Sequence, residues 1–149
     1  MPLSTPAEAP LRATSTAPAA DQADSTTPTY SLPDLVCFAH LHWDFVWQRP
    51  QHLLSRFAQH GRVFYVEDAF FHADDLIEPH MEVKERQNGV KVLVVHLPNR
   101  LRGNEAASDQ AQVEVLKQFF ADNGVDTYVF WVYTPMAMNR VQQFQPVLT

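Results

Sequence analysis

The sequence predicts an α/β domain with a mostly parallel sheet flanked by helices, and three observations predict it. Short apolar runs alternate along the chain with longer segments in which apolar residues recur at helical spacing. The runs are apolar at consecutive positions, as in parallel strands that are buried on both faces. The chain has 149 residues, of which 46% are hydrophobic, so it suffices for one domain with a packed core.

The first 33 residues differ from the rest and are expected to form a disordered tail. Residues 1–33 hold six of the eleven prolines, are rich in Ala, Ser and Thr, and contain few large apolar side chains. Such a segment cannot bury enough apolar surface to offset the entropy that ordering costs. It lacks the apolar core of a secretory signal, and its acidic residues argue against a mitochondrial presequence. The folded domain is therefore expected at 34–149.

The domain is predicted to begin with a strand, a loop, a helix and a second strand. Residues 35–39 are an apolar run typical of a buried strand. A helix follows the loop 40–49, because Pro50 has the φ of a first helical turn and Gly61 is placed to end the helix in the left-handed region. Residues 62–66 form the second strand, and the crossover of such a βαβ unit is right-handed.

The remaining elements are predicted from alternation, turn residues and helical spacing. Asn88-Gly89 supplies a two-residue hairpin turn, and Gly124 ends a helix. Thr134-Pro135 matches an N-cap followed by a first-turn proline. In chain order the elements are an irregular loop at 68–79, hairpin strands at 81–85 and 90–95, a polar loop at 99–104, a helix from 105 or 108 to 123, a strand at 128–133, a helix after Thr134, and the opening of one more strand at 147–149.

Charge and composition exclude several classes of function. The net charge of −6 argues against broad binding to nucleic acid or to anionic membranes, since either needs an excess of Lys and Arg on one face. No apolar run is long enough for a transmembrane helix. The one cysteine, Cys37, lies within the first strand, so it is interpreted as a small buried hydrophobe. A chain that forms no internal disulfide is compatible with a reducing cytoplasm, which is the location we expect.

Ligands of such sheets bind outside the carboxyl ends of the strands, near the point where strand order reverses. Four loops are expected at that edge, and the first is the richest in polar and aromatic side chains. The loops are His40–Arg49, Asp68–Pro79, Leu97–Asn104 and Thr134–Met136.

His40 and His42 in the first loop offer two chemistries. Two imidazoles could bind zinc, but only Asp44 or His52 is placed as a third ligand, so we expect no metal. Otherwise one histidine hydrogen-bonds within the loop and the other meets solvent or substrate, where it could act as an acid or a base. No Ser–His–Asp or Cys–His arrangement can be assembled from the sequence, so catalytic residues are unassigned.

Trp43, Phe45 and Trp47 alternate, which suits a short extended segment. Either the rings wedge into the core beneath the loop, or one ring offers a stacking face to a sugar or another planar-faced ligand. Asp44 lies between them and needs a partner if it is buried. A bidentate pair with Arg49 is the obvious partner, and it would lock the loop or hold ligand hydroxyls.

Gln48, Arg49 and Gln51 lie at the start of the first predicted helix, where free N–H groups and the helix dipole favour an anion such as phosphate. No glycine occurs between residues 35 and 60, however, and a dinucleotide fingerprint needs glycines. We therefore expect no nicotinamide or flavin cofactor. A small nucleotide-binding protein that places Glu67 on a ribose is a third interpretation.

The stretch HLHWDFVWQRPQHLLSRFA resembles the amino-terminal domain of bacterial GT-B glycosyltransferases (glycosyltransferase family 1/family 4-like). It is similar to a subgroup whose first loop carries a tryptophan, followed by Gln-Arg-Pro-Gln at the start of the first helix. The stretch ERQNGVKVLVVHLP is similar to a hairpin of that domain that ends in Leu-Pro, and Tyr133-Thr134-Pro135-Met136 matches after a later strand. The matching positions of the first motif are Trp43, Asp44, Gln48, Arg49, Pro50 and Gln51.

The resemblance implies a partial Rossmann-like domain, the incomplete N-terminal half of a GT-B fold. Such an enzyme is a hexosyltransferase that moves a sugar from a nucleotide-sugar to a polysaccharide or glycolipid acceptor of the cell envelope. It works in the cytoplasm or peripherally at the inner membrane face, and it needs no metal or other cofactor. The residues implied to contact substrate are His40, His42, Trp43, Asp44, Gln48, Arg49 and Gln51.

In this family the amino-terminal domain receives the acceptor and a C-terminal domain binds the donor, so we expect this chain to be a fragment that lacks the donor domain. Alone it is expected to have no turnover, because half a cleft cannot orient both reactants. The Gly-Gly found in the first loop of related enzymes is replaced here by the bulky segment 40–47. The alternative is a non-catalytic Rossmann-like module that needs a partner chain to cover its open sheet edge.

Overall fold

The computed structural model describes residues 31–149. The predicted disorder of the tail at 1–33 falls on positions outside the described residues, except for the last three. The first strand begins at Asp34, one residue before the predicted start at residue 35. None of the described helices is long and apolar enough to cross a membrane.

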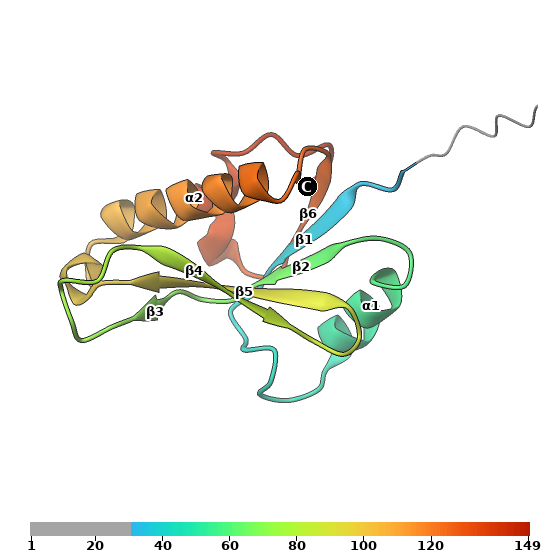
Figure 1. Cartoon of the computed structure of the whole chain (residues 1–149), viewed down its shortest axis with the longest axis horizontal. Coiled ribbons are helices and arrows are strands. Elements are labelled where there is room, and N and C mark those ends of the chain that lie inside the picture. The colour runs from blue at the N-terminus through green and yellow to red at the C-terminus, as the bar shows by residue number, and fades with distance from the viewer. Residues whose placement is uncertain (1–30) are drawn as a thin grey trace, which may run out of the picture. The chain divides into compact units, whose positions relative to one another are not determined.

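Six strands form one sheet, and all strand pairs but one are parallel (Figure 1). β1 (Asp34–Phe38) lies between β2 (Val63–Val66) and β6 (Tyr128–Val132) and runs parallel to both. β5 (Val90–Leu97) continues the sheet beyond β2, again in parallel. The mostly parallel α/β sheet predicted from the sequence is confirmed.

Two further strands complete the sheet around β5. β4 (His80–Glu85) runs antiparallel along β5, and β3 (Phe70–Phe71) pairs in parallel with the last residues of β5. β4 occupies one edge of β5. The other edge of β5 therefore pairs first with β2 and then, further along the strand, with β3. Beyond β6, Leu148 forms a parallel bridge with Val129, which agrees with the strand opening predicted at 147–149.

Helices cover both faces of this sheet (Figure 1). α2 (Glu105–Asp122) and α3 (Met138–Val141) pack on one face, and α1 (Arg49–Phe57) packs on the other. Alternate residues of a strand point to opposite faces, so each strand contributes to both cores. The core under α2 includes Val36, Phe38, Phe64, Leu93, Leu116, Phe119 and Phe130, and the core under α1 includes Cys37, Trp43, Leu54, Tyr65 and Val92.

Local hydrogen bonds set the ends of the helices. The Asn104 side chain accepts from the Ala107 N–H (3.1 Å), which starts α2 at the first of the two predicted positions. The prediction that Gly61 ends α1 in the left-handed region is wrong, because positive φ occurs in the described range only at three other glycines. The His60 N–H already bonds to the Phe57 carbonyl (2.9 Å), so the helix closes in a turn before Gly61.

Short turns connect the strands at both ends of the sheet. The predicted β4–β5 hairpin is present, but its loop has three residues, 87–89, because the Arg86 N–H bonds to the Val90 carbonyl (3.0 Å). After β5 comes the 3-10 turn η1 (Asn99–Leu101). After β6 the Thr134 hydroxyl accepts from the Met136 N–H (3.4 Å) and caps a second 3-10 turn, η2 (Pro135–Ala137), which leads into α3.

Candidate functional site

The strand order reverses at β1, because the chain continues from β1 to β2 on one side and later adds β6 on the other. The carboxyl ends of these neighbouring strands therefore lie together at one edge of the sheet. The loop 39–48 follows β1, Glu67 and Asp68 follow β2, and Tyr133 and Thr134 follow β6. This is the edge at which the sequence predicts a ligand site.

Glu67 anchors the loop that follows β1. Its carboxylate is 6% exposed, Oε1 accepts from the Trp43 backbone N–H (2.6 Å), and Oε2 contacts Nδ1 of His42 (3.0 Å). A buried carboxylate needs such partners, because removal from water without them is costly. Both Glu67 oxygens are therefore engaged by the loop, and the carboxylate is buried beneath it, whereas the ribose contact of the third interpretation needs an accessible acid.

Gln51 and Tyr65 hold the same loop from below. The Gln51 side chain is buried at 2% exposure and donates to the carbonyls of Trp43 (3.2 Å) and Val46 (3.0 Å), while its Oε1 accepts from the Gln48 N–H (3.1 Å). The Tyr65 hydroxyl donates to the Leu41 carbonyl (2.9 Å). Burial raises the pKa of Tyr65, so its hydroxyl stays a neutral donor. Gln51 thus orders the loop from a buried position.

The rings of the loop divide between core and solvent. Trp43 is 2% exposed and packs edge-on against Tyr65 (ring centroids 4.9 Å apart) and Trp47 (5.7 Å). Of the two interpretations of its ring, the wedge into the core is the one observed. The expected extended alternation fails because Phe45 N–H bonds to the His42 carbonyl (3.1 Å) in a turn. Phe45 and Trp47, at 72% and 51% exposure, supply the aromatic surface of the loop.

The prediction that Asp44 pairs with Arg49 is wrong. Asp44 instead pairs with Nη2 of Arg86, at the tip of the β4–β5 hairpin. This pair ties the loop to the hairpin, since the two residues are far apart in sequence. Arg49 is exposed in the first turn of α1 and forms no ion pair within residues 31–149.

Arg49 lies near the carboxyl end of β6. Burial raises the pKa of the Tyr133 hydroxyl, and the positive charge of Arg49 opposes that rise. Tyr133 directly follows β6, and the Tyr133 N–H bonds to the Phe38 carbonyl at the end of β1 (2.9 Å). The exposed cation therefore stands where the strand order reverses.

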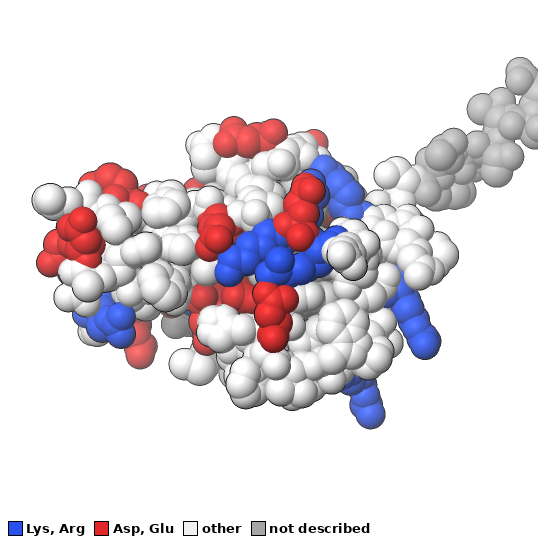
Figure 2. Space-filling view, turned by 60° about the horizontal axis from the view of Figure 1, so that its bottom comes forward, with Lys and Arg blue, Asp and Glu red and all other residues white. Residues whose placement is uncertain are grey.

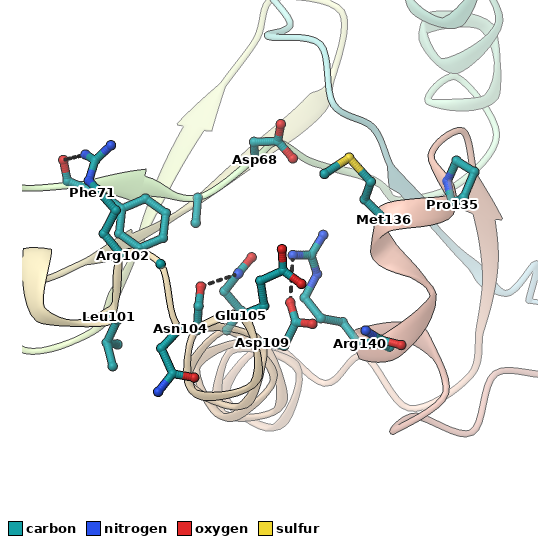
Figure 3. Close-up of a pocket in the computed structure, with 15 residues that line it drawn as sticks. Asp68, Phe71, Leu101, Arg102, Asn104, Glu105, Asp109, Pro135, Met136 and Arg140 are labelled. Atoms are coloured by element: carbon teal, nitrogen blue, oxygen red, sulfur yellow. Dashed lines mark hydrogen bonds and ion pairs between the residues drawn. The ribbon is translucent and has the colours of Figure 1, made fainter.

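A cavity of about 490 Å³ opens at the same sheet edge (Figure 3). It lies between the loops after β2, β5 and β6 and the first turns of α2, and this volume falls within the range of small-molecule sites. Arg140 of α3 and Asp109 of α2 form an ion pair across its floor (3.1 Å), and Glu105 points toward the same guanidinium in Figure 3. The polar and charged lining residues include Asp68, Arg102, Asn104, Glu105, Asp109 and Arg140.

None of the seven predicted site residues lines this cavity. His40 and Gln48 are exposed, and the His42 side chain is 67% exposed. Three of the four loops expected at the ligand edge do contribute lining residues, through Asp68, Leu101 and Met136. Sequence analysis missed Asp109 and Arg140, which lie on helices outside those loops, although the polar loop 99–104 signalled the neighbouring Arg102 and Asn104.

His40 and His42 do not converge on a third ligand. Within residues 31–149 the group of His, Cys, Asp or Glu side chains whose donor atoms converge is His72, His80 and His96, on the far strands of the sheet. Cys37 is buried and contributes no ligand; burial raises the pKa of its thiol to about 12.

Charges of both signs alternate along the hairpin strands. Lys84 contacts Glu82 (3.8 Å) and Lys91 contacts Glu85 (3.5 Å). Figure 2 shows the same pattern on one face of the molecule, where Lys and Arg side chains at the centre are bordered by Asp and Glu. This face therefore carries no broad basic patch of the kind that holds a nucleic-acid backbone.

In comparisons with protein-family models, curated proteins and solved structures, nothing matched the chain.

Proposed function

We propose that this chain is the acceptor-side, Rossmann-like domain of a GT-B glycosyltransferase, which transfers a sugar from a nucleotide-sugar to a polysaccharide or glycolipid acceptor. The observation that carries the proposal is the cavity at the carboxyl edge of the sheet, beside the reversal of strand order. In open α/β sheets this is the place where ligands bind. The motif that resembles the glycosyltransferases, 40–51, forms the loop at that same edge.

The loop presents a set of groups that suits a sugar acceptor. Phe45 and Trp47 offer exposed rings, and aromatic faces stack on the apolar faces of sugars. The Trp47 indole N–H donates to Nδ1 of His52 (3.1 Å), which fixes the orientation of that ring. His40 and His42 add donors and acceptors beside them. Buried Trp43 and Gln51 support this arrangement from beneath, so the acceptor contacts pass to the neighbouring exposed residues.

Arg49 supplies the charge that transfer requires. The acceptor oxygen bonds to the anomeric carbon, the bond from that carbon to the diphosphate oxygen breaks, and the acceptor proton passes to a base. The departing diphosphate gains negative charge, which a cation and the free N–H groups of a helix start stabilise. Arg49 lies in the first turn of α1 and is exposed at the reversal point, so it supplies the cation. The helix start adds little to it, because Pro50 has no N–H and the Gln48 N–H donates to Oε1 of Gln51 (3.1 Å).

The test is the substitution Arg49→Ala in a polypeptide that contains this domain together with a donor domain. Loss of a cation that acts on developing charge lowers the transfer rate by about 100-fold. The melting temperature stays near that of the unsubstituted protein, because Arg49 is exposed and forms no ion pair within the described residues. Arg56→Ala is the matched control, since Arg56 is an exposed arginine in the last turn of the same helix. Equal transfer rates for both variants would remove Arg49 from the site.

The second candidate is a non-catalytic module that binds a partner chain. Phe45, Val46 and Trp47 are consecutive and exposed, and contiguous apolar surface marks interaction sites. If this candidate is correct, the protein has no transfer activity, and Trp47→Ser abolishes its association with the partner. A protein that sediments as a monomer at all concentrations and in the presence of cell extract would count against it.

A further inference from the structure

Three histidines, one each from β4 and β5 and one just after β3, meet at one corner of the sheet. His72 directly follows β3, His80 opens β4 and lies opposite His96 of β5. His96 continues the row of Val90, Val92 and Val94, which faces the α1 side of the sheet. At this end of the row a polar cluster replaces the apolar residues.

The donor atoms of the three rings converge. One nitrogen from each of His72, His80 and His96 lies within 4.8 Å of the others. Nε2 of His72 is 2.7 Å from Nδ1 of His96, and the His80 and His96 rings stack with centroids 4.9 Å apart. Three imidazoles placed this close have either protons or a cation between their nitrogens.

Hydrogen bonds to the outer nitrogens fix which nitrogens face inward. The Glu78 carbonyl can only accept, so His80 carries its proton on Nδ1 (2.9 Å) and keeps a lone pair on Nε2. Glu82 accepts from Nε2 of His96 (2.7 Å), which leaves the lone pair of Nδ1 directed at His72.

This is the outer arrangement of histidine metal sites, in which each ligand donates its other N–H to a carboxylate or a carbonyl. We propose that His72, His80 and His96 bind one divalent transition-metal ion of the zinc type, with Glu82 and the Glu78 carbonyl orienting two of the ligands. The expectation of no metal rested on His40 and His42 and on the resemblance to transferases that need none, and neither ground considered this corner of the sheet. The proposal is independent of the proposed transferase function.

Small side-chain movements convert the cluster into a tetrahedral site. Two nitrogens that bind zinc tetrahedrally at about 2.05 Å lie about 3.3 Å apart. The 2.7 Å contact between His72 and His96 therefore opens by about 0.6 Å when the metal replaces the shared proton, and His72 then carries its proton on Nδ1. His80 is exposed, so its ring can tilt from the stack to place Nε2 on the ion.

The ligand set also indicates the kind of ion. Neutral imidazoles favour zinc, copper or nickel over magnesium and calcium, which prefer oxygen. Three histidines leave the fourth position to water or an incoming oxygen ligand, as in zinc sites that keep an open position. The Glu82 carboxylate adds negative charge beside the cluster, which favours a dication.

The test is calorimetric titration of the metal-stripped full chain with ZnCl₂, with MgCl₂ as the competing ion class. We expect one zinc per chain, no magnesium binding, and a visible absorption band of tetrahedral type when Co²⁺ replaces zinc. His80→Asn removes an exposed ligand without loss of core packing, and it weakens zinc binding by at least about tenfold. Glu82→Gln keeps every ligand and weakens binding by about 10–100-fold, as loss of an orienting carboxylate does.

His60→Asn is the matched control, because His60 is an exposed histidine in the turn after α1. It leaves zinc affinity unchanged. Circular dichroism of each variant without metal shows that it is folded. A folded parent chain that binds no zinc overturns the proposal, and so does unaltered affinity in both His80→Asn and Glu82→Gln.

Discussion

Gln51→Met tests whether Gln51 orders the loop from within the core. Methionine matches glutamine in length and in helix propensity, so the substitution removes hydrogen bonds and leaves no large cavity. The buried carbonyl of Trp43 loses its partner, which costs about 2 kcal/mol, and the two half-buried partners, Val46 and Gln48, cost about 0.5 kcal/mol each because water reaches them. The expected loss of unfolding free energy is about 3 kcal/mol.

A loss of this size is measurable by urea unfolding and by thermal melting. For a domain of this size it corresponds to a fall in Tm of about 10 °C. Gln59→Met is the matched control, because Gln59 is exposed just beyond the same helix, and surface substitutions change stability by about 0.5 kcal/mol or less. If Gln51→Met costs no more than Gln59→Met, the side chain does not anchor the loop and the reasoning from its three hydrogen bonds is refuted.

Two further predictions concern buried groups. Burial raises the pKa of the Cys37 thiol to about 12, so it stays unreactive toward a thiol reagent at pH 8 until urea unfolds the chain. As pH rises, the thiol ionises in the unfolded chain before it ionises in the folded one, so the stability that the neutral buried thiol contributes is lost between about pH 9 and pH 12. Cys37→Ala therefore flattens the plot of unfolding free energy against pH in that range. Rapid labelling of the folded protein would contradict both the low reactivity and this pH dependence. Arg62→Ala removes the guanidinium that donates two hydrogen bonds to the buried carboxylate of Asp34 (2.7 and 2.5 Å). We expect urea unfolding to show a loss of about 2 kcal/mol of unfolding free energy. This is less than for a fully buried pair, because the Arg62 side chain is 47% exposed. If Arg62→Ala and Arg56→Ala lower the unfolding free energy equally, the Arg62–Asp34 pair contributes nothing to stability.

The strands and the two larger helices could be predicted because local signals bound them. Pro50 and Asn104 mark helix starts, and the strands are apolar runs that need no partner to be recognised. β3 was missed because two residues carry no periodicity, and Phe70-Phe71 becomes a strand only by pairing with the end of β5. The error at Gly61 is of the same kind, because the turn that replaces it depends on hydrogen bonds the sequence does not show.

The loop contacts could not be predicted because they join distant segments. Asp44 has a basic neighbour in sequence, Arg49, yet it pairs with Arg86, which the hairpin brings close. Trp43 and Gln51 are polar-tipped residues of a loop and a helix start, and nothing local indicates that both lie over β2. The edge of the sheet that holds the cavity was predictable, since it follows from parallel topology alone.

The histidine cluster shows how one residue of register decides a site. A two-residue turn at Asn88-Gly89 would place Met81 opposite His96, and His80 would point to the other face. The observed three-residue loop shifts the pairing by one, so His80 lies opposite His96 instead. No motif in the sequence signals this extra residue, and three histidines on three separate elements form no recognisable spacing.

The loop after β1 is held by buried polar groups and exposes a different set of residues. Glu67, Gln51 and Tyr65 together bind five of its backbone groups, so the loop is ordered before any ligand arrives. Ordering in advance lowers the entropy that binding must overcome, and it fixes where Trp47 and Arg49 stand. Substitutions of the two sets therefore separate: loss of an anchor lowers stability and weakens binding together, whereas loss of Arg49 weakens binding and leaves stability unchanged.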